Sequence, residues 1–146
     1  MELRIKSFDG LSCRELYEIL RLRSQVFIVE QQGCYQDPDG IDYDSVHIYI
    51  EDRGELLGCI RVFAKKDEEG TCQLGRLVVR DRLRGLGSRL MAAAEETAKQ
   101  RFGASRVFLT GRRSAREFYE KCGYSRQVPA AYREADAPYY LFRKDL

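Results

Sequence analysis

Hydrophobic residues first alternate with polar ones along the chain and then recur at helical spacing. Leu3 and Ile5 alternate with charged neighbours in "LRIKSF", which predicts a first strand. Ser12 is followed three residues later by Glu15, a capping-box pattern that predicts the start of a helix. One helical face then continues to about residue 29. Its members are Leu16, Ile19, Leu20, Arg23 and Phe27.

The next part of the chain changes from polar to strand-like. Residues 30–44, "EQQGCYQDPDGIDYD", hold glycine, proline and four aspartates, which is too polar for the interior of an element and predicts a loop. Three apolar segments follow, "SVHIYIE", "LLGCIRVFAK" and "CQLGRLVV". The turn-like segments "DRGE" and "KDEEG" separate them, so we predict three successive strands.

The second half of the chain alternates between helix and strand patterns. A helix is predicted to begin near Gly85 and to end at Gly103, and "RVFLT" is apolar enough for a buried central strand. Ser114 and Glu117 form a second capping-box pattern, before a short helix that Gly123 closes. The tail predicts two strands around a loop near residue 136. The order β-α-β-β-β-α-β-α-β-β predicts one α/β domain over residues 1–146, with a mixed central sheet flanked by helices.

Composition narrows the class of protein. The chain has 146 residues, 44% hydrophobic and 33% charged, which suits one domain with a proper core. It contains no run of about 18 apolar residues and no apolar signal core, so we expect no membrane span and a cytoplasmic protein. The net charge of +2 gives no general reason to expect nucleic-acid binding. Five cysteines without a C-x-x-C pair favour free thiols over disulfides or a zinc site.

Positive charge is concentrated in one turn, "RDRLRGLGSR". The start of a helix exposes unpaired N–H groups, and Gly85 and Gly87 would let an anion approach them, with the Ser88 hydroxyl nearby. Five arginines surround this turn, which suits a ligand with several phosphates: Arg76, Arg80, Arg82, Arg84 and Arg89. No lysine follows Gly87, against a Walker loop, and Leu90 occupies the third small position of a Rossmann fingerprint. An ordinary turn with solvated arginines remains the alternative.

Two linked motifs give the chain a family resemblance. The R-x-x-G-x-G pattern, "RLRGLG", lies between "GRLVV" and an alanine-rich helix and resembles the acyl-CoA-binding motif of GNAT N-acetyltransferases. The later "FYEKCGY" is similar to that family's F-Y-x-x-x-G-[FY] segment. "LRSQVFIVEQQGCYQDPDGID" resembles the ElaA-like branch of the same family. The resemblance covers almost the whole chain and thins after about residue 128.

The resemblance implies an acyltransferase with the GNAT fold that moves an acetyl group from acetyl-CoA to a primary amine by direct attack. The cofactor pyrophosphate would lie on backbone N–H groups of residues 82–88, and pantetheine would lie along the fourth strand. The N–H of Val79 would polarise the thioester carbonyl, although the side chains of Leu77 and Val79 are also expected in the core. The implied cofactor-binding residues are Leu77, Val78, Val79, Arg82, Arg84, Gly85, Leu86, Gly87, Ser88 and Arg89.

The resemblance also implies proton-transfer residues. Tyr119 occupies the position of the family's acid. A phenol with an unperturbed pKa near 10, above a thiol's value near 8.5, is protonated at neutral pH and can deliver a proton as the leaving sulfur develops charge. The alternative is a core tyrosine with a satisfied hydroxyl. Glu30 is the first candidate for the base that deprotonates the amine. His47, the single histidine, is the second candidate, with a packed core histidine as the alternative.

The acidic loop and the end of the fifth strand leave choices open. Asp37, Asp39 and Asp42 are predicted on the substrate side, where they would attract a cationic amine, although Asp-Pro and Asp-Gly also fold turns. The loop lacks the spacing of an EF-hand, so no metal is expected. "TGRR" departs from the family pattern after the fifth strand, where Arg112 or Arg113 could meet a phosphate instead.

Three functional hypotheses result. The first is an acetyltransferase acting on a small-molecule or peptide amine, as a monomer or homodimer without nucleic-acid or membrane partners. The second is an acyl-CoA-binding sensor or partner protein without turnover. The third is a nucleic-acid binder that uses the arginine turn, which the near-neutral charge disfavours.

Overall fold

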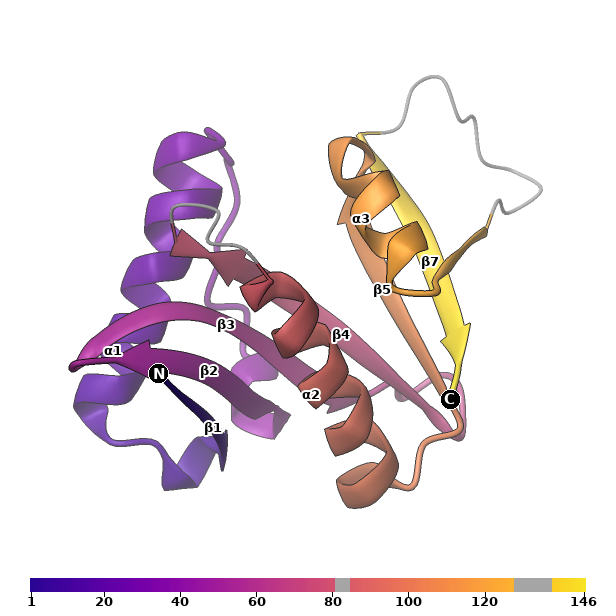
Figure 1. Ribbon diagram of the computed structural model, residues 1–146, viewed down its shortest axis with the longest axis horizontal. Helices are drawn as coiled ribbons and strands as arrows, with labels where there is room; N and C mark the ends of the chain where they lie inside the picture. Colours follow the sequence, from indigo (N-terminus) through magenta and orange to yellow (C-terminus); the bar gives the residue numbers. More distant parts are fainter. Residues whose placement is uncertain (81–84, 128–137) are drawn as a thin grey trace.

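The computed structural model describes residues 1–80, 85–127 and 138–146, which form strands and helices in the predicted order (Figure 1). The strands are β1 (Glu2–Ser7), β2 (Val46–Asp52), β3 (Glu55–Ala64), β4 (Thr71–Val79), β5 (Arg106–Arg112), β6 (Ser125–Gln127) and β7 (Tyr139–Asp145). The helices are α1 (Cys13–Arg23), α2 (Leu86–Phe102) and α3 (Arg116–Lys121). Short turns of other helix types are η1 (Phe8–Gly10), η2 (Ser24–Glu30), η3 (Ile41–Asp44) and η5 (Arg113–Ala115).

The strands form one mixed sheet in the order β1-β2-β3-β4-β5-β7-β6. The pair β4–β5 is parallel, and the other neighbouring strands pair antiparallel. A parallel pair needs a crossover connection, and α2 supplies it. The predicted mixed α/β sheet is therefore confirmed.

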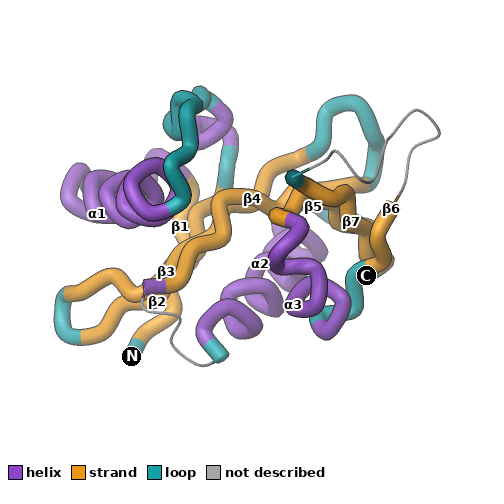
Figure 2. The backbone as a smooth tube through the Cα atoms, turned by 90° about the horizontal axis from the view of Figure 1, so that it is seen from above, coloured by secondary structure: helices purple, strands orange, loops and turns teal. Residues whose placement is uncertain are grey.

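Helices cover both faces of the sheet, with α1 on one face and α2 and α3 on the other (Figure 2). On the α1 face, Ile19 and Leu22 pack against Tyr49, Cys59 and Val78. The opposite face holds the larger core, in which α2 packs its buried side chains against β2, β3 and β4. None of the described helices is both long and apolar enough to cross a membrane.

Several predicted ends and turns are confirmed. The Ser12 side chain accepts from the Glu15 N–H at 3.1 Å, and the Glu15 carboxylate accepts from the Ser12 N–H at 2.8 Å, so the first capping box is complete. Gly103 ends α2 in the left-handed region at φ 64°. Arg53 and Gly54 both have positive φ, as a tight turn between β2 and β3 requires.

Two helix predictions need correction. Ser114 and Glu117 do not form a capping box: Ser114 lies inside η5, and α3 begins only after Ala115, without a side-chain cap. The cause is that the Arg113 N–H still bonds the Pro138 carbonyl at 2.9 Å, so this segment remains attached to the neighbouring strand region. The first helix does reach Glu30, but from Ser24 it becomes a π-helical turn.

Candidate active site

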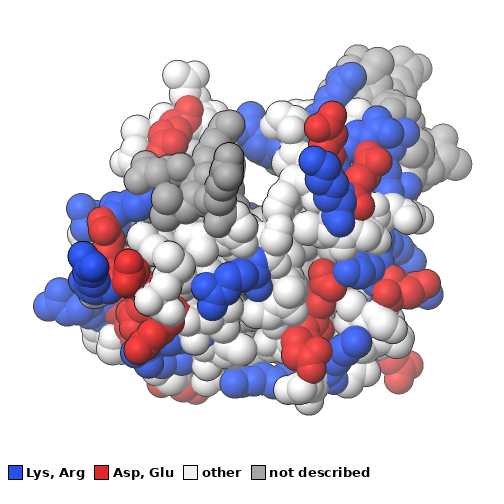
Figure 3. Space-filling view, viewed as in Figure 1, with Lys and Arg blue, Asp and Glu red and all other residues white. Residues whose placement is uncertain are grey.

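A cleft lies where β4 and β5 separate. Their pairing is limited to residues 71–73 of β4 and 106–108 of β5, and the strands diverge toward their carboxyl ends (Figure 1). The resulting space has a volume of about 960 Å³. Its walls come from both strands, from η2 on the α1 face, and from α2 and α3 on the opposite face. In the space-filling view, a notch separates the part of the molecule around α1 from the part around α3 (Figure 3).

The divergence begins at a bulge in β4. Its pairing with β3 shifts register between Gly75 and Val78, and Arg76 within this step adopts φ 54°. A left-handed residue other than glycine costs free energy, so surrounding contacts must hold it. Bulges bend a strand and end its regular pairing. The bulge therefore turns β4 away from β5. An isolated glycine within a strand pattern, as in "QLGRLVV", is the sequence signal that could have predicted it.

The edge of β4 that faces the cleft has no partner strand beyond Gln73 among the described residues. Backbone N–H and C=O groups on such an edge can bind an extended ligand with amide groups. Leu77 and Val79, which the resemblance implies for the cofactor path, both line the cleft. Val78 points to the other face of the sheet, where it packs with the α1 side chains.

The start of α2 borders the same cleft. Gly85 precedes the helix at φ 75° as its N-cap residue, and no side chain of the described residues caps the first N–H groups. Gly85, Gly87 and Ser88 line the cleft, whereas Leu86 is buried in the core. Arg89 is exposed, with its guanidinium 4.0 Å from the sulfur of Met1. The predicted cofactor residues Arg82 and Arg84 lie outside the described residues.

Gly87 has a packing role as well. A Cβ atom at this position would lie 3.2 Å from Phe118 Cζ, so only hydrogen fits without displacing that ring. The close approach joins the start of α2 to α3 across the cleft wall. Phe118 and Gly87 are thus both required for the shape of this wall.

Tyr119 lies in the wall of the cleft with its ring buried. The ring packs against the rings of Phe118, Tyr124 and Phe142, with distances of 5.1 to 6.3 Å between ring centroids. Burial raises the pKa of the Tyr119 hydroxyl to about 12, so this group is protonated at neutral pH. No hydrogen bond joins the hydroxyl to another residue in the part of the chain that the structure describes.

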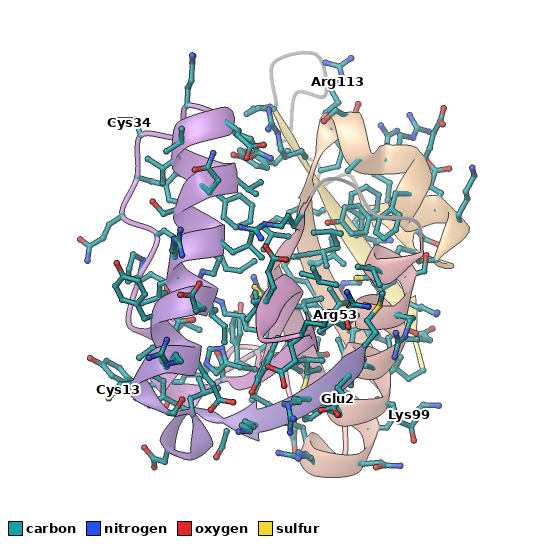
Figure 4. All side chains as sticks on the ribbon, turned by 60° about the vertical axis from the view of Figure 1, so that its left-hand side comes forward. Glu2, Cys13, Cys34, Arg53, Lys99 and Arg113 are labelled. Carbon is teal, nitrogen blue, oxygen red and sulfur yellow. The ribbon has the colours of Figure 1, made fainter. Side chains whose placement is uncertain are left out.

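Gly111 makes room for this tyrosine. A Cβ at Gly111 would lie 2.4 Å from Tyr119 Cε2, a distance that no side chain tolerates. The segment "TGRR", which departs from the family pattern, therefore places Gly111 directly against the ring of Tyr119, the candidate acid. Arg112, the next residue, lines the cleft. Arg113 lies at the rim of the molecule, with its guanidinium 6.0 Å from the Tyr140 ring centroid (Figure 4).

The two candidate bases lie away from the described walls of the cleft. Glu30 is exposed at the end of η2 and accepts a hydrogen bond from Gln25 at 3.3 Å. His47 is buried on the α1 face, where its Nε2 lies 2.9 Å from the Asp42 carbonyl. Burial lowers the pKa of His47, which favours the neutral ring. The geometry therefore favours the packed-histidine alternative for His47, and a role for Glu30 would require an intervening water.

The aspartates of the acidic loop meet arginines inside the protein. We call Arg23, Arg61, Arg76, Asp37, Asp39 and Asp42 the arginine–aspartate network. Arg23 is 1% exposed and binds Asp37 at 2.8 Å and Asp42 at 2.7 Å. Arg61 binds both carboxylate oxygens of Asp39, at 2.8 and 2.7 Å. The network ties residues 37–42 to α1 and β3.

Arg76 connects this network to the bulge. Its Nε lies 2.8 Å from Asp37 Oδ1, an ion pair without the alignment of a hydrogen bond, and its Nη2 lies 3.2 Å from Asp39 Oδ2. The guanidinium also lies 5.4 Å from the Tyr35 ring centroid. These contacts hold the left-handed conformation of Arg76 at the bulge.

The network changes the interpretation of the acidic loop. Three aspartates face three arginines, so their charges balance, and Asp37 and Asp42 are almost fully buried. Buried carboxylates that are paired with arginines attract a cation from solution only weakly, and Asp39, although exposed, is paired with Arg61 and Arg76, so the geometry favours a structural role over the predicted substrate role. The sequence pattern identified the aspartates but not their partners, because Arg23, Arg61 and Arg76 are distant along the chain.

All five cysteines are free thiols, and Cys13 and Cys34 lie at opposite ends of the α1 layer (Figure 4). Among the described residues, no three His, Cys, Asp or Glu side chains are grouped as metal ligands.

Known proteins resemble this chain in sequence and structure. The model of the Acetyltransferase (GNAT) family matches residues 13–124. A UPF0039 protein of Schizosaccharomyces pombe is 34% identical to this chain in sequence, and the alignment covers 100% of this chain and 98% of that protein. The crystal structure of Escherichia coli ElaA superposes with a TM-score of 0.87 at 31% identity, and covers 99% of both chains. An acyl-CoA N-acyltransferase from Pseudomonas aeruginosa gives a TM-score of 0.86 at 32% identity, also over 99% of both chains.

Proposed function

Because the chain belongs to the acetyltransferase (GNAT) family, we propose that it transfers an acetyl group from acetyl-CoA to a primary amine. Its similarity to ElaA confirms the ElaA-like resemblance. The observation that carries the proposal is the cleft between β4 and β5. It combines within one space a buried phenol with a strand edge and a helix start that have no partner strand and no side-chain cap among the described residues. Each of these matches one part of a thioester cofactor.

The cofactor phosphates are proposed to bind at the start of α2. The uncapped N–H groups and the positive end of the helix dipole favour an anion there. Gly85 and Gly87 present backbone without an intervening side chain, and the Ser88 hydroxyl adds a donor. The two amides of pantetheine would then pair with the free edge of β4 near Leu77 and Val79.

In the proposed reaction, the neutral amine nitrogen attacks the thioester carbonyl carbon. A C–N bond forms, the C–S bond breaks, the nitrogen loses a proton and the coenzyme A sulfur gains one. A backbone N–H at Val79 would stabilise the negative charge that develops on the carbonyl oxygen. The products are an acetamide and free coenzyme A thiol.

Tyr119 is proposed to assist the leaving sulfur. Its pKa of about 12 lies well above that of a thiol near 8.5, so complete proton transfer to a thiolate is unfavourable. Donation of a hydrogen bond to the sulfur as charge develops remains favourable, because the hydroxyl is protonated and has no partner among the described residues. This role is electrostatic and needs no proton to leave the phenol.

The test is release of free thiol from acetyl-CoA in the presence of a panel of amines, with mass spectrometry of the amine product. We expect thiol release that depends on both the protein and the amine. Tight binding of acetyl-CoA without turnover of any amine would contradict the proposal and favour the acyl-CoA-binding sensor instead.

A further inference from the structure

The cleft opens on both faces of the sheet. On one face its lining comes from the start of α2 and from α3, and includes Ser88 and Tyr119. On the other face the lining comes from η2 and the loop after it, and includes Gln31 and Tyr35. In the proposed function, the cofactor enters at the α2 side because its phosphates bind there. The acceptor must then approach the thioester from the α1 side.

Strand geometry places Arg112 at this α1-side mouth. Successive side chains in a strand point to opposite faces of a sheet. Gly111 faces α3, because a Cβ there would meet the Tyr119 ring. Arg112 therefore points to the opposite face, and it lines the cleft. Its register partner is Tyr139 on β7, which is half exposed and also lines the cleft.

The charge at this mouth is positive. Among the described residues that line the cleft, none is acidic, and the charged ones are Arg76 and Arg112. The charge of Arg76 is balanced within the arginine–aspartate network. Arg112 is exposed, and its side chain forms no ion pair or hydrogen bond with any residue in the described ranges. Its guanidinium donors are therefore available to a ligand.

We propose that the acceptor amine carries an anionic group, such as a carboxylate, which Arg112 binds at the α1-side mouth of the cleft. A guanidinium binds a carboxylate through two parallel hydrogen bonds, which fixes the orientation of the acceptor as well as its position. The proposal rests on the proposed acetyl transfer and names the substrate class of the same site.

Pairing with Arg112 also assists the chemistry. An unpaired carboxylate on the acceptor would stabilise its ammonium form, and the ion pair with Arg112 offsets that stabilisation, so the pKa of the bound amine is lower than it would be without the arginine. A larger fraction of the anionic acceptor is then neutral near pH 7 and competent to attack. The effect is useful here because neither Glu30 nor His47 lines the described part of the cleft. Amines with a second positive charge are repelled by the same arginine.

The experiment compares acceptors in matched pairs with the wild-type protein: β-alanine with propylamine, phenylalanine with phenethylamine, and taurine with ethylamine, besides the diamine cadaverine. Thiol release gives kcat/KM for each amine at saturating acetyl-CoA. We expect the anionic member of at least one pair to exceed its partner about tenfold or more. Cadaverine should be the poorest acceptor.

The variant Arg112→Gln then assigns the preference. It should lower kcat/KM for the anionic acceptor roughly 10- to 100-fold, with unchanged KM for acetyl-CoA and unchanged rates with the paired amines that lack the anionic group. Arg101→Gln is the matched control, because Arg101 is exposed in the last turn of α2, at the other end of that helix from Gly85. The control should behave as wild type.

Three outcomes would overturn the inference. A preference for cadaverine, or for the amines that lack an anionic group, contradicts the inference and leaves the proposed acetyl transfer intact. A weaker affinity of Arg112→Gln for acetyl-CoA assigns the arginine to the cofactor instead. Absence of thiol release with every amine, while acetyl-CoA binds, contradicts the proposed function and with it this inference.

Discussion

Tyr119 is the residue on which the proposed chemistry depends most closely. The variant Tyr119→Phe removes one oxygen and keeps the ring that packs against Phe118 and Phe142. We expect kcat to fall about 10- to 100-fold, because a donor to the developing sulfur charge is lost. Stability should change by less than about 1 kcal/mol, since the hydroxyl has no partner among the described residues. Steady-state kinetics and urea unfolding measure the two effects, and unchanged kcat would remove Tyr119 from the mechanism.

Gly111 is predicted to be intolerant of a side chain. In Gly111→Ala the new Cβ would lie 2.4 Å from Tyr119 Cε2, so the ring must move out of a packed core. Overpacking of this kind costs roughly 1–3 kcal/mol, and turnover should fall with it. In the double variant with Tyr119→Leu, the added methyl should cost much less stability than it does alone. Urea unfolding of the wild type, the two single variants and the double variant measures the coupling free energy between the two positions. Additive losses of stability would show that the two positions do not compete for space.

At the scale of elements, the arginine–aspartate network holds the acidic loop and the β4 bulge together. The hydrogen bonds from Arg61 lower the pKa of Asp39 to about 2, below the value near 4 expected in the unfolded chain. The folded state thus binds fewer protons than the unfolded state between these values. Asp39 therefore stabilises the protein above pH 4, and this stabilisation is lost as the pH falls from about 4 to about 2.

The variant Asp39→Asn tests this account. It should lower stability at pH 7 by roughly 1–3 kcal/mol, because Arg61 loses one of its two carboxylate partners and keeps only Asp42. It should also flatten the acid limb of the stability curve below pH 4. Asp44→Asn is the control, since Asp44 is an exposed member of the same loop and lies outside the network. Identical acid unfolding of the two variants, followed by circular dichroism, would contradict the assignment.

The sequence predicts elements better than it predicts what joins them. Apolar alternation, the Ser12–Glu15 box and the closing glycines depend on neighbours within a few residues, so they were sufficient for strand order and most helix ends. The Ser114–Glu117 pattern failed because a contact from outside the segment, between Arg113 and Pro138, held it in a different conformation. The arginine partners of Asp37, Asp39 and Asp42 likewise depend on the tertiary fold.

At the scale of the whole molecule, the divergence of β4 and β5 produces the site. The pairing of the two strands stops at Gln73, just before the bulge at Arg76, and the start of α2 borders the same cleft. A strand edge and a helix start without partners among the described residues therefore face one space. The motif residues Gly85, Gly87 and Tyr119 could be predicted from sequence, because the family pattern fixes their spacing. The opening of the cleft on both faces of the sheet could not be predicted from sequence, because it depends on the angle between β4 and β5.

Binding of acetyl-CoA at the start of α2 is the central claim, and calorimetric titration of three proteins tests it most directly. The wild type should bind acetyl-CoA. Gly87→Glu should bind it at least about tenfold more weakly than Gly87→Gln, because both side chains meet Phe118 at the same 3.2 Å but only glutamate places a negative charge beside the phosphates. Equal affinities for all three proteins, or no binding by the wild type, would contradict the account.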